Sequence, residues 1–343
     1  MQISDYEFEL PDELIAQKPL ENRENSRMLF VSRSEKNWRD EHFYNFPSFL
    51  LEDDVLVLNN TKVFPARLLG ESETGAKIEV FLVEEVEQNI WETLARPAKR
   101  LKVGKKITFD ENLSAEVIEK SEEGRVFIRF YTNGNFDEII DRIGKTPLPP
   151  YIKRESENSD EDRERYQTVF AKQRGAIAAP TAGLHFTPRI LEDIKNRGIS
   201  VTEITLHVGY GTFEPVRVED LSKHMVLPEN YEISEQTAEI LNRAKSENRR
   251  IIAVGTTTTR TLESAISNDK KFYAGKNQAN LTITPNYKFR AIDGLLTNFH
   301  LPQSSLLVLV STFGGHELIM NAYRHAVAAG YRFYSYGDCM LII

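Results

Sequence analysis

The segment AAPTAGLHFTPRILEDIKNRGISVTEITLHVGYGTFEPV, residues 178–216, carries a helix signal and a strand signal between two turns. Thr187 is a suitable N-cap, Pro188 takes the first helical position and Gly198 stands just past the end, which are the start and stop residues that helices favour. The stretch 199–208 is rich in β-branched residues and predicts a strand. A turn, a helix and a strand in this order are typical of an α/β sheet.

The two turns of this segment gather small, hydroxyl and imidazole side chains. Thr181 and His185 belong to the first turn, and His207 and Thr212 belong to the second. Open α/β sheets bind ligands on loops beyond the strand ends, so the cluster predicts a functional site. For His207 alone, a hydrogen-bonded core histidine is the favoured interpretation. The glycines of the second turn are not followed by a helix start, so they are not a dinucleotide fingerprint.

The chain after residue 166 alternates strands with helices, which predicts a mostly parallel sheet with helices on both faces. A strand at 250–254 leads through a threonine-rich turn into a helix, and further helices are predicted at 234–248, 306–313 and 317–329. Hydroxyls and free backbone N–H groups coincide at the helix start around Thr256, close to the cation Arg260. This combination predicts a site for a carboxylate or phosphate, without the lysine of a Walker motif.

A different pattern occupies residues 67–130, where short alternating strands are separated by turn residues. Five or six antiparallel strands of this spacing predict a small barrel that closes its own edges. The barrel interrupts the α/β pattern, so we expect an α/β catalytic domain formed by residues 1–61 and 146–343 and an inserted barrel domain formed by residues 62–145. The polar run 154–165 is predicted to be an exposed loop.

Size and composition exclude several classes of protein. A chain of 343 residues with 41% hydrophobic residues can bury a large core, and its length suggests two domains. The N-terminal residues show no targeting signal and the longest apolar run, 306–310, is far too short to cross a membrane, so a cytoplasmic protein is expected. The single cysteine, Cys339, excludes an internal disulfide, and the seven histidines lack metal-site spacing, so no metal is expected.

The net charge of −8 argues against a protein that coats nucleic acid with its overall field, but a local basic strip stands out. Six cations fall within eleven residues without an intervening acid, and we define the basic strip as Arg96, Lys99, Arg100, Lys102, Lys105 and Lys106. Such clusters attract phosphates. On charge alone, a tRNA-binding surface and a merely solvated loop are equally favoured.

Five long motifs in fixed order resemble the S-adenosylmethionine:tRNA ribosyltransferase-isomerases of queuosine biosynthesis. They are AAPTAGLHF at 178–186, LHVGYGTF at 206–213, GTTTTRTLE at 255–263, TNFHLP at 297–302 and YRFYSYGD at 331–338. The resemblance covers the whole chain and implies an α/β domain that carries an inserted β-barrel. Two positions depart from the family pattern: Leu227 stands where a histidine is usual, and Lys62 stands where arginine is more frequent.

The resemblance implies a reaction in which the ribosyl part of S-adenosylmethionine moves to 7-aminomethyl-7-deazaguanine at the tRNA wobble position. The products are epoxyqueuosine, adenine and methionine, so S-adenosylmethionine is a consumed co-substrate and no permanently bound cofactor is expected. The implied partners are S-adenosylmethionine and the anticodon of tRNA, and a monomer is expected. The residues expected to bind substrate are Thr181, Thr212, Thr256, Arg260, Asn298, His300 and Tyr336, and the methionine carboxylate is expected at the start of the helix from Thr256 to Arg260 or at the turn after Asn298.

This chemistry requires a base to remove a proton from the ribose 5′ carbon and an acid to protonate the departing adenine. His185 and His207 titrate in the right range, and Asp338 is the candidate carboxylate. The roles of base and acid stay open among these three residues.

Two other function classes remain open. A conventional methyltransferase would leave the nucleoside whole, and the glycine-rich turn from strand to helix that would favour it is missing. A noncatalytic RNA-binding barrel protein would depend on the basic strip and not on the threonine, histidine and aspartate loops.

Overall fold

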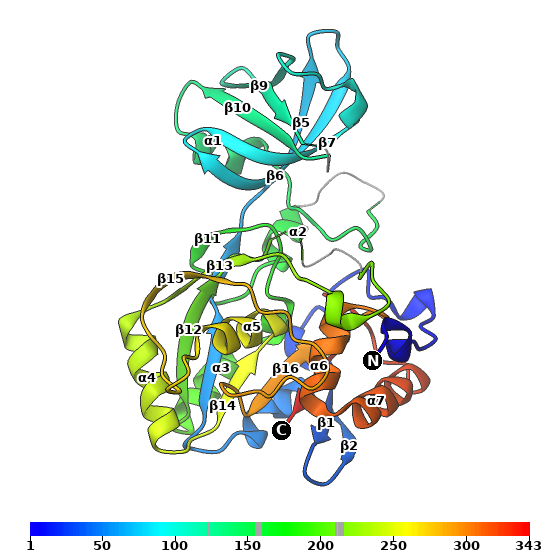
Figure 1. The fold of residues 1–343 in the computed structure, drawn as a ribbon, viewed down its shortest axis with the longest axis vertical. Helices are drawn as coiled ribbons and strands as arrows, with labels where there is room; N and C mark the ends of the chain where they lie inside the picture. The colour runs from blue at the N-terminus through cyan, green and yellow to red at the C-terminus, as the bar shows by residue number, and fades with distance from the viewer. Residues whose placement is uncertain (122–123, 155–159, 210, 212–215) are drawn as a thin grey trace.

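The protein consists of an α/β domain with a separate β-barrel at one end of its long axis (Figure 1). The structure is a computed structural model, and it describes residues 1–121, 124–154, 160–209, 211 and 216–343, with the side chains of Arg100 and Asp160 left out. The α/β fold with an inserted antiparallel barrel, expected from the sequence, is confirmed. The domain boundaries themselves, at 61/62 and 145/146, stay a prediction.

A nine-stranded sheet forms the centre of the α/β domain, in the order β15-β13-β12-β3-β14-β16-β17-β1-β2. Its strands are β1 (Arg27–Ser32), β2 (Asn37–His42), β3 (Val55–Asn59), β12 (Ser200–Leu206), β13 (Glu229–Ile233), β14 (Ile251–Val254), β15 (Gly275–Ala279), β16 (Gly294–Asn298) and β17 (Cys339–Ile342). The sheet is mixed. Its centre, β12-β3-β14-β16, is parallel as expected, whereas β13, β15 and β2 are joined by antiparallel pairs, and β17 pairs antiparallel with β16.

The central strands are buried on both faces, which explains their continuous apolar sequence. Val55 and Val57 of β3 pack into one core cluster, while Leu56 and Leu58 pack into another on the opposite face. This division follows from the alternation of side chains along a strand. Because β12, β3, β14 and β16 are parallel, their carboxyl ends meet at one edge of the sheet. Open α/β sheets bind their ligands at this edge.

Helices cover both faces of the sheet. The chain forms α1 (Phe136–Ile143), α2 (Asp160–Arg165), α3 (Pro188–Asn196), α4 (Glu235–Ser246), α5 (Thr256–Ala265), α6 (Ser305–Gly314) and α7 (His316–Ala328). The face that carries Leu56 packs against α3 and the 3₁₀ segment Phe43–Phe49, and the other face packs against α4 to α7. The predicted caps are present, since the side chains of Thr187 and Ser234 accept hydrogen bonds from the first turns of α3 and α4.

The barrel closes through six antiparallel strands with a core of its own. They are β5 (Arg67–Ser72), β6 (Lys77–Glu87), β7 (Ile90–Arg96), β8 (Lys106–Asp110), β9 (Leu113–Lys120) and β10 (Val126–Thr132). The strand β4 (Thr61–Val63) precedes the barrel in the sequence and β11 (Gln173–Ala176) follows it. These two strands pair in parallel and form a separate two-stranded sheet. The amide of Asn230 also donates to Glu84 of β6 at 3.1 Å, which links the sheet to the barrel.

The prediction of an exposed loop at 154–165 is wrong for its second half, which forms α2. Asp162 is buried there, and Arg154 donates to both of its carboxylate oxygens at 2.7 and 2.8 Å. A polar sequence conceals this helix because ion pairing, rather than an apolar face, holds it in place. Residues 155–159 lie outside the described part of the chain.

Candidate functional site

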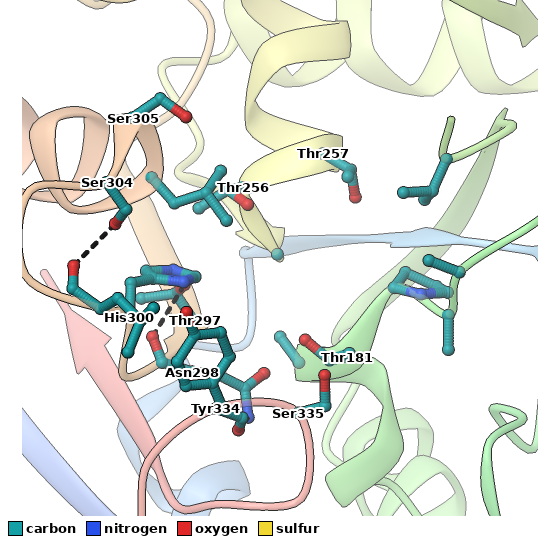
Figure 2. Close-up of a pocket in the computed structure, with 18 of the residues that line it drawn as sticks. Thr181, Thr256, Thr257, Thr297, Asn298, His300, Ser304, Ser305, Tyr334 and Ser335 are labelled. Carbon is teal, nitrogen blue, oxygen red and sulfur yellow. Dashed lines mark hydrogen bonds between the residues drawn. The ribbon is translucent and has the colours of Figure 1, made fainter. Parts of the chain in front are cut away.

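A cavity of about 330 Å³ lies at the carboxyl edge of the parallel strands. Its wall is built from the connector before α2, the turn after β11, and the residues that follow β12, β14, β16 and precede β17. Figure 2 shows Thr256 and Thr257 on one side of the cavity, with Tyr334 and Ser335 on the other. A cavity of this size is within the range of small-molecule sites.

Thr256 and Thr257 reach the cavity because β14 runs directly into α5. Gly255 joins the two elements with a φ of 94°, a conformation that residues with a side chain rarely adopt. The first turn of α5 therefore presents its N–H groups at the cavity. The Oγ1 of Thr257 is buried and has no hydrogen-bond partner among the described atoms, so it can bind a ligand.

Asn298 is the last residue of β16 and lines the cavity. Its amide nitrogen donates to the carbonyl of Tyr334 at 3.1 Å and lies 3.2 Å from Nε2 of His185. The amide oxygen has no partner among the described atoms. A buried oxygen without a partner, on a residue that lines a cavity, is a candidate group for binding a ligand.

His185 stands behind Asn298 and is not part of the cavity wall. Burial, reinforced by the charges of Arg332 and Arg23, lowers the pKa of His185 to about 3. Both ring nitrogens are engaged, one with Asn298 and the other with Ser26 at 2.9 Å. The geometry gives no support to a direct role of this imidazole in proton abstraction.

His207 directly follows β12 and does not line the cavity. Its neighbour Val208 lines the cavity, whereas His207 lines a separate groove of about 440 Å³ over β12, β13 and β15. Successive side chains of an extended chain point to opposite sides, so the two residues cannot share the cavity. His207 Nδ1 is 2.8 Å from the hydroxyl of Thr61, and burial lowers its pKa. The interpretation as a hydrogen-bonded histidine fits this geometry.

Asp338 is also absent from the cavity wall. Its carboxylate accepts the backbone N–H groups of Arg27 at 2.9 Å and Arg332 at 2.8 Å, so it joins two segments of the chain. Burial raises the pKa of Asp338 against the effect of these hydrogen bonds. Its surroundings are those of a structural carboxylate.

Arg260 does not face the cavity, although it lies only one turn beyond Thr256. Its side chain is 5% exposed, and its guanidinium binds the carboxylate of Glu229 at 2.5 Å. Three further hydrogen bonds go to backbone carbonyls, those of Leu227, Ala279 and Leu281. The guanidinium is thus occupied by the protein, and the expected contact with a substrate carboxylate has no geometric support.

The other predicted substrate-binding residues divide into three groups. Thr181, Thr256, Asn298 and His300 line the cavity together. Tyr336 is buried nearby and lines a smaller cavity with His185, where its hydroxyl has no partner among the described atoms. Thr212 lies outside the described residues.

His300 is the one histidine of the described cavity wall. Burial lowers its pKa to about 3, so it is neutral at pH 7. Its Nε2 is 2.9 Å from the hydroxyl of Thr297, as Figure 2 shows. No aspartate, glutamate, lysine or arginine occurs among the described residues of the wall.

The sequence interpretation missed an aromatic part of the wall. The rings of Tyr151 and Tyr334 lie with their centroids 3.8 Å apart, and the hydroxyl of Tyr151 is hydrogen-bonded to Ser335. These residues are almost 200 positions apart in the chain, so no local pattern joins them. The positive φ of 72° at Tyr334 is visible only in the structure, and such strain at a non-glycine residue is often associated with function.

The basic strip lies on the barrel, around the connection from β7 to β8. Arg96, Lys99, Lys102 and Lys106 are exposed and Lys105 is half-buried. None of these five forms an ion pair with a described residue, so their charges are available to a partner. The side chain of Arg100 is outside the described part of the structure.

The described residues contain neither a candidate metal site nor a candidate membrane-spanning helix. Among them, no group of three or more histidine, cysteine, aspartate or glutamate side chains is arranged to hold a metal ion. Within the same residues, no helix has the length and apolar character needed to span a membrane.

The chain matches the model of a family described as "Queuosine biosynthesis protein" over residues 3–342. The S-adenosylmethionine:tRNA ribosyltransferase-isomerase of Natranaerobius thermophilus is 47% identical over 345 residues, which cover 100% of this chain and 99% of the relative. That of Staphylococcus saprophyticus is 49% identical over 345 residues and 100% of both chains. The crystal structure of S-adenosylmethionine tRNA ribosyltransferase from Thermotoga maritima matches with a TM-score of 0.57 and 36% identity, covering 99% of this chain and 100% of the other.

Proposed function

The chain belongs to the queuosine biosynthesis protein family, and from this premise we propose that its cavity of about 330 Å³ binds the S-adenosylmethionine whose ribosyl part is transferred to tRNA. The enzyme is an S-adenosylmethionine:tRNA ribosyltransferase-isomerase, as its relatives are. It transfers and isomerises the ribosyl part of S-adenosylmethionine onto 7-aminomethyl-7-deazaguanine at the wobble position. The products are epoxyqueuosine-tRNA, adenine and methionine. The observation that carries the assignment of the cavity is its position at the carboxyl ends of the parallel strands, where residues of all five family motifs line it.

The two sides of the cavity suit the two ends of the substrate. The tyrosine rings at 151 and 334 offer an aromatic surface for adenine, since nucleobases stack on aromatic side chains. The opposite side offers the N–H groups and hydroxyls of the first turn of α5, which suit the methionine carboxylate. Arg260 is not part of this proposal, because Glu229 neutralises it. Thr256 and Thr257 take its place.

The uncharged wall has a chemical consequence. S-adenosylmethionine carries a sulfonium, and the described wall provides no carboxylate that would stabilise this charge. A positive sulfonium in a wall without counter-charge acidifies the adjacent 5′ carbon and remains a good leaving group. This setting favours elimination of methionine over tight binding of the ground state. A catalytic site gains rate by binding the transition state more strongly than the substrate.

Product analysis tests the proposed function directly. A tRNA that carries 7-aminomethyl-7-deazaguanine is incubated with the protein and S-adenosylmethionine, and nucleosides and small products are measured by mass spectrometry. We expect one adenine and one methionine for each modified tRNA. A methylated tRNA with S-adenosylhomocysteine would instead identify a methyltransferase. Binding of tRNA without turnover would identify a noncatalytic RNA-binding protein.

We propose that the basic strip holds tRNA phosphates. The proposal is supported by the exposure of Arg96, Lys99, Lys102 and Lys106, none of which forms an ion pair with a described residue. Replacing Arg96, Lys99, Lys102 and Lys106 by alanine should weaken tRNA binding and flatten its salt dependence. Each lost phosphate contact removes about 0.7 to 0.9 from the slope of log K against log salt concentration. Alanine at the exposed Lys270 and Lys271 serves as the matched control. An unchanged slope in the strip variant would show that tRNA binds elsewhere.

Three further features of the proposal concern the setting of the reaction. S-adenosylmethionine is consumed, and we propose that no cofactor stays bound between turnovers. A cytoplasmic location is proposed because the substrate tRNA resides in the cytoplasm. A monomeric state is proposed as a separate point.

A further inference from the structure

The hydrogen bonds around Asn298 fix the direction of its amide. The carbonyl of Tyr334 can only accept, so the group 3.1 Å from it must be the amide nitrogen. The same nitrogen lies 3.2 Å from Nε2 of His185, which must therefore accept as well. The oxygen Oδ1 is left on the other side, buried and without a partner among the described atoms.

The same reasoning fixes the proton on His185. A neutral imidazole carries one N–H, and because Nε2 accepts, the proton is on Nδ1. Nδ1 is 2.9 Å from the hydroxyl of Ser26 and donates to it. Ser26 in turn donates to the carbonyl of Arg23 at 2.7 Å. The chain from Asn298 through His185 and Ser26 to Arg23 thus runs in one direction, and each member has a partner.

The surroundings of His185 keep this series of hydrogen bonds in one arrangement. The imidazole is 4% exposed, and the ring of Phe43 packs against it with centroids 5.4 Å apart. The guanidiniums of Arg23 and Arg332 are the nearby charges that lower its pKa, together with burial. A proton added to Nε2 would face the N–H of Asn298, so the neutral form is the one that satisfies the chain.

We propose that Oδ1 of Asn298 is a fixed hydrogen-bond acceptor for an N–H or O–H group of the adenosyl part of S-adenosylmethionine, and that His185 is a positioning residue that holds the amide in this orientation. The proposal rests on the proposed function of the cavity. It gives His185 a role that requires no contact with substrate and no proton transfer. Two donor sources share this chemistry: the amino group of adenine and the hydroxyls of ribose.

A rotated amide cannot replace the fixed one. Rotation would turn Oδ1 toward Nε2 of His185 and the carbonyl of Tyr334, which are both acceptors, and two hydrogen bonds would be lost. A ligand without a donor at this place leaves Oδ1 buried and unpaired. The expected loss of affinity is about ten- to a hundredfold.

The test compares S-adenosylmethionine with analogues that lack one donor. One arm uses an N6,N6-dimethyladenosyl analogue, and the other uses 2′-deoxy and 3′-deoxy ribosyl analogues. In the wild-type protein we expect one of these analogues to bind about ten- to a hundredfold more weakly. In the Asn298→Ala variant, the ratio between S-adenosylmethionine and that analogue should fall to near one. Thr312→Val removes a hydroxyl of α6 that is not part of the described wall and should leave the ratio as in the wild type.

Two variants of His185 separate positioning from catalysis. His185→Gln can place an oxygen near the position of Nε2 and should keep the analogue ratio, whereas His185→Leu removes the acceptor. We expect His185→Leu to raise KM for S-adenosylmethionine about ten- to a hundredfold. At saturating S-adenosylmethionine, it should still lose deuterium from a 5′-labelled substrate. Ser26→Ala should shift KM in the same direction by a smaller factor, and it serves as the milder test if His185→Leu unfolds.

The outcomes distinguish this inference from the proposed function. Loss of 5′-deuterium release in both His185→Gln and His185→Leu, with binding intact, would make the imidazole the base and overturn the inference. Equal analogue ratios in wild type and Asn298→Ala would overturn it as well. If the wild-type protein binds no S-adenosylmethionine and releases no adenine, the proposed function itself is wrong.

Discussion

Replacement of Arg260 by alanine is expected to lower the free energy of unfolding by about 3–5 kcal/mol. The side chains of Arg260 and Glu229 are 5% and 4% exposed, and the variant would leave the Glu229 carboxylate buried without its cation. Removing one member of a buried pair costs far more than the pair contributes, since the remaining charge cannot regain its hydration. Three hydrogen bonds to backbone carbonyls are lost as well. Urea unfolding of both proteins measures the difference.

Two controls make the expected loss specific to burial. Arg243 pairs with Glu247 at 2.8 Å, but its side chain is 74% exposed, so Arg243→Ala should change the free energy of unfolding very little. The double replacement Arg260→Met with Glu229→Gln removes both charges and should recover most of the stability lost in the single variant. If Arg260→Ala is as stable as the wild type and raises KM for S-adenosylmethionine but not for tRNA, Arg260 binds the substrate.

Acidification below pH 6.5 is expected to destabilise the protein steeply, because His185 and His300 are buried in their neutral form. The pKa of each is lowered from 6.5 to about 3, chiefly by burial. The unfolded chain therefore binds more protons than the folded one between pH 3 and 6.5. Stability is full above pH 6.5, falls as pH drops below it, and has lost the whole contribution near pH 3. For each histidine the slope approaches about 1.4 kcal/mol per pH unit.

The interval from pH 6.5 to 5 isolates this effect, because most carboxylates remain ionised there. Burial also lowers the pKa values of His207 and His224, which add to the slope, while the raised pKa of Asp338 acts in the opposite direction at lower pH. Thermal unfolding of wild type, His185→Gln and His300→Gln at several pH values measures the slope. Each variant should show a smaller slope than the wild type. A midpoint that does not change between pH 7 and 5 would contradict the neutral burial of both imidazoles.

The expected effects of Arg260→Ala and of acidification have a common cause, which is the burial of charged and titratable groups near the cavity. The charged and titratable groups that surround the cavity, including Arg260, Asp338 and His185, are held by protein partners rather than presented to a ligand. The described residues that line the cavity include no aspartate, glutamate, lysine or arginine. Under the proposed function, binding relies on directed hydrogen bonds and aromatic contact.

The sequence by itself determined the features that depend on local rules. Thr187, Pro188 and Gly198 bound α3 because capping acts within one helical turn. The alternating strands between residues 67 and 130 predicted the barrel because each strand shows one face to its core. The loop that carries Thr181 was predicted to belong to a site because open α/β sheets bind ligands beyond their strand ends, and Thr256 because a helix start offers free N–H groups, whereas Asn298 was implied by the resemblance.

The tertiary structure decided which side chains of those loops face the cavity. The sequence could not show that Val208 rather than His207 does so, since the side on which an alternating segment packs depends on its neighbours. It could not pair Arg260 with Glu229, which lies 31 positions away, or join His185 to Ser26 across 159 positions. Such contacts depend on the packing of distant segments, and burial then sets whether a charged or imidazole group remains available to a substrate.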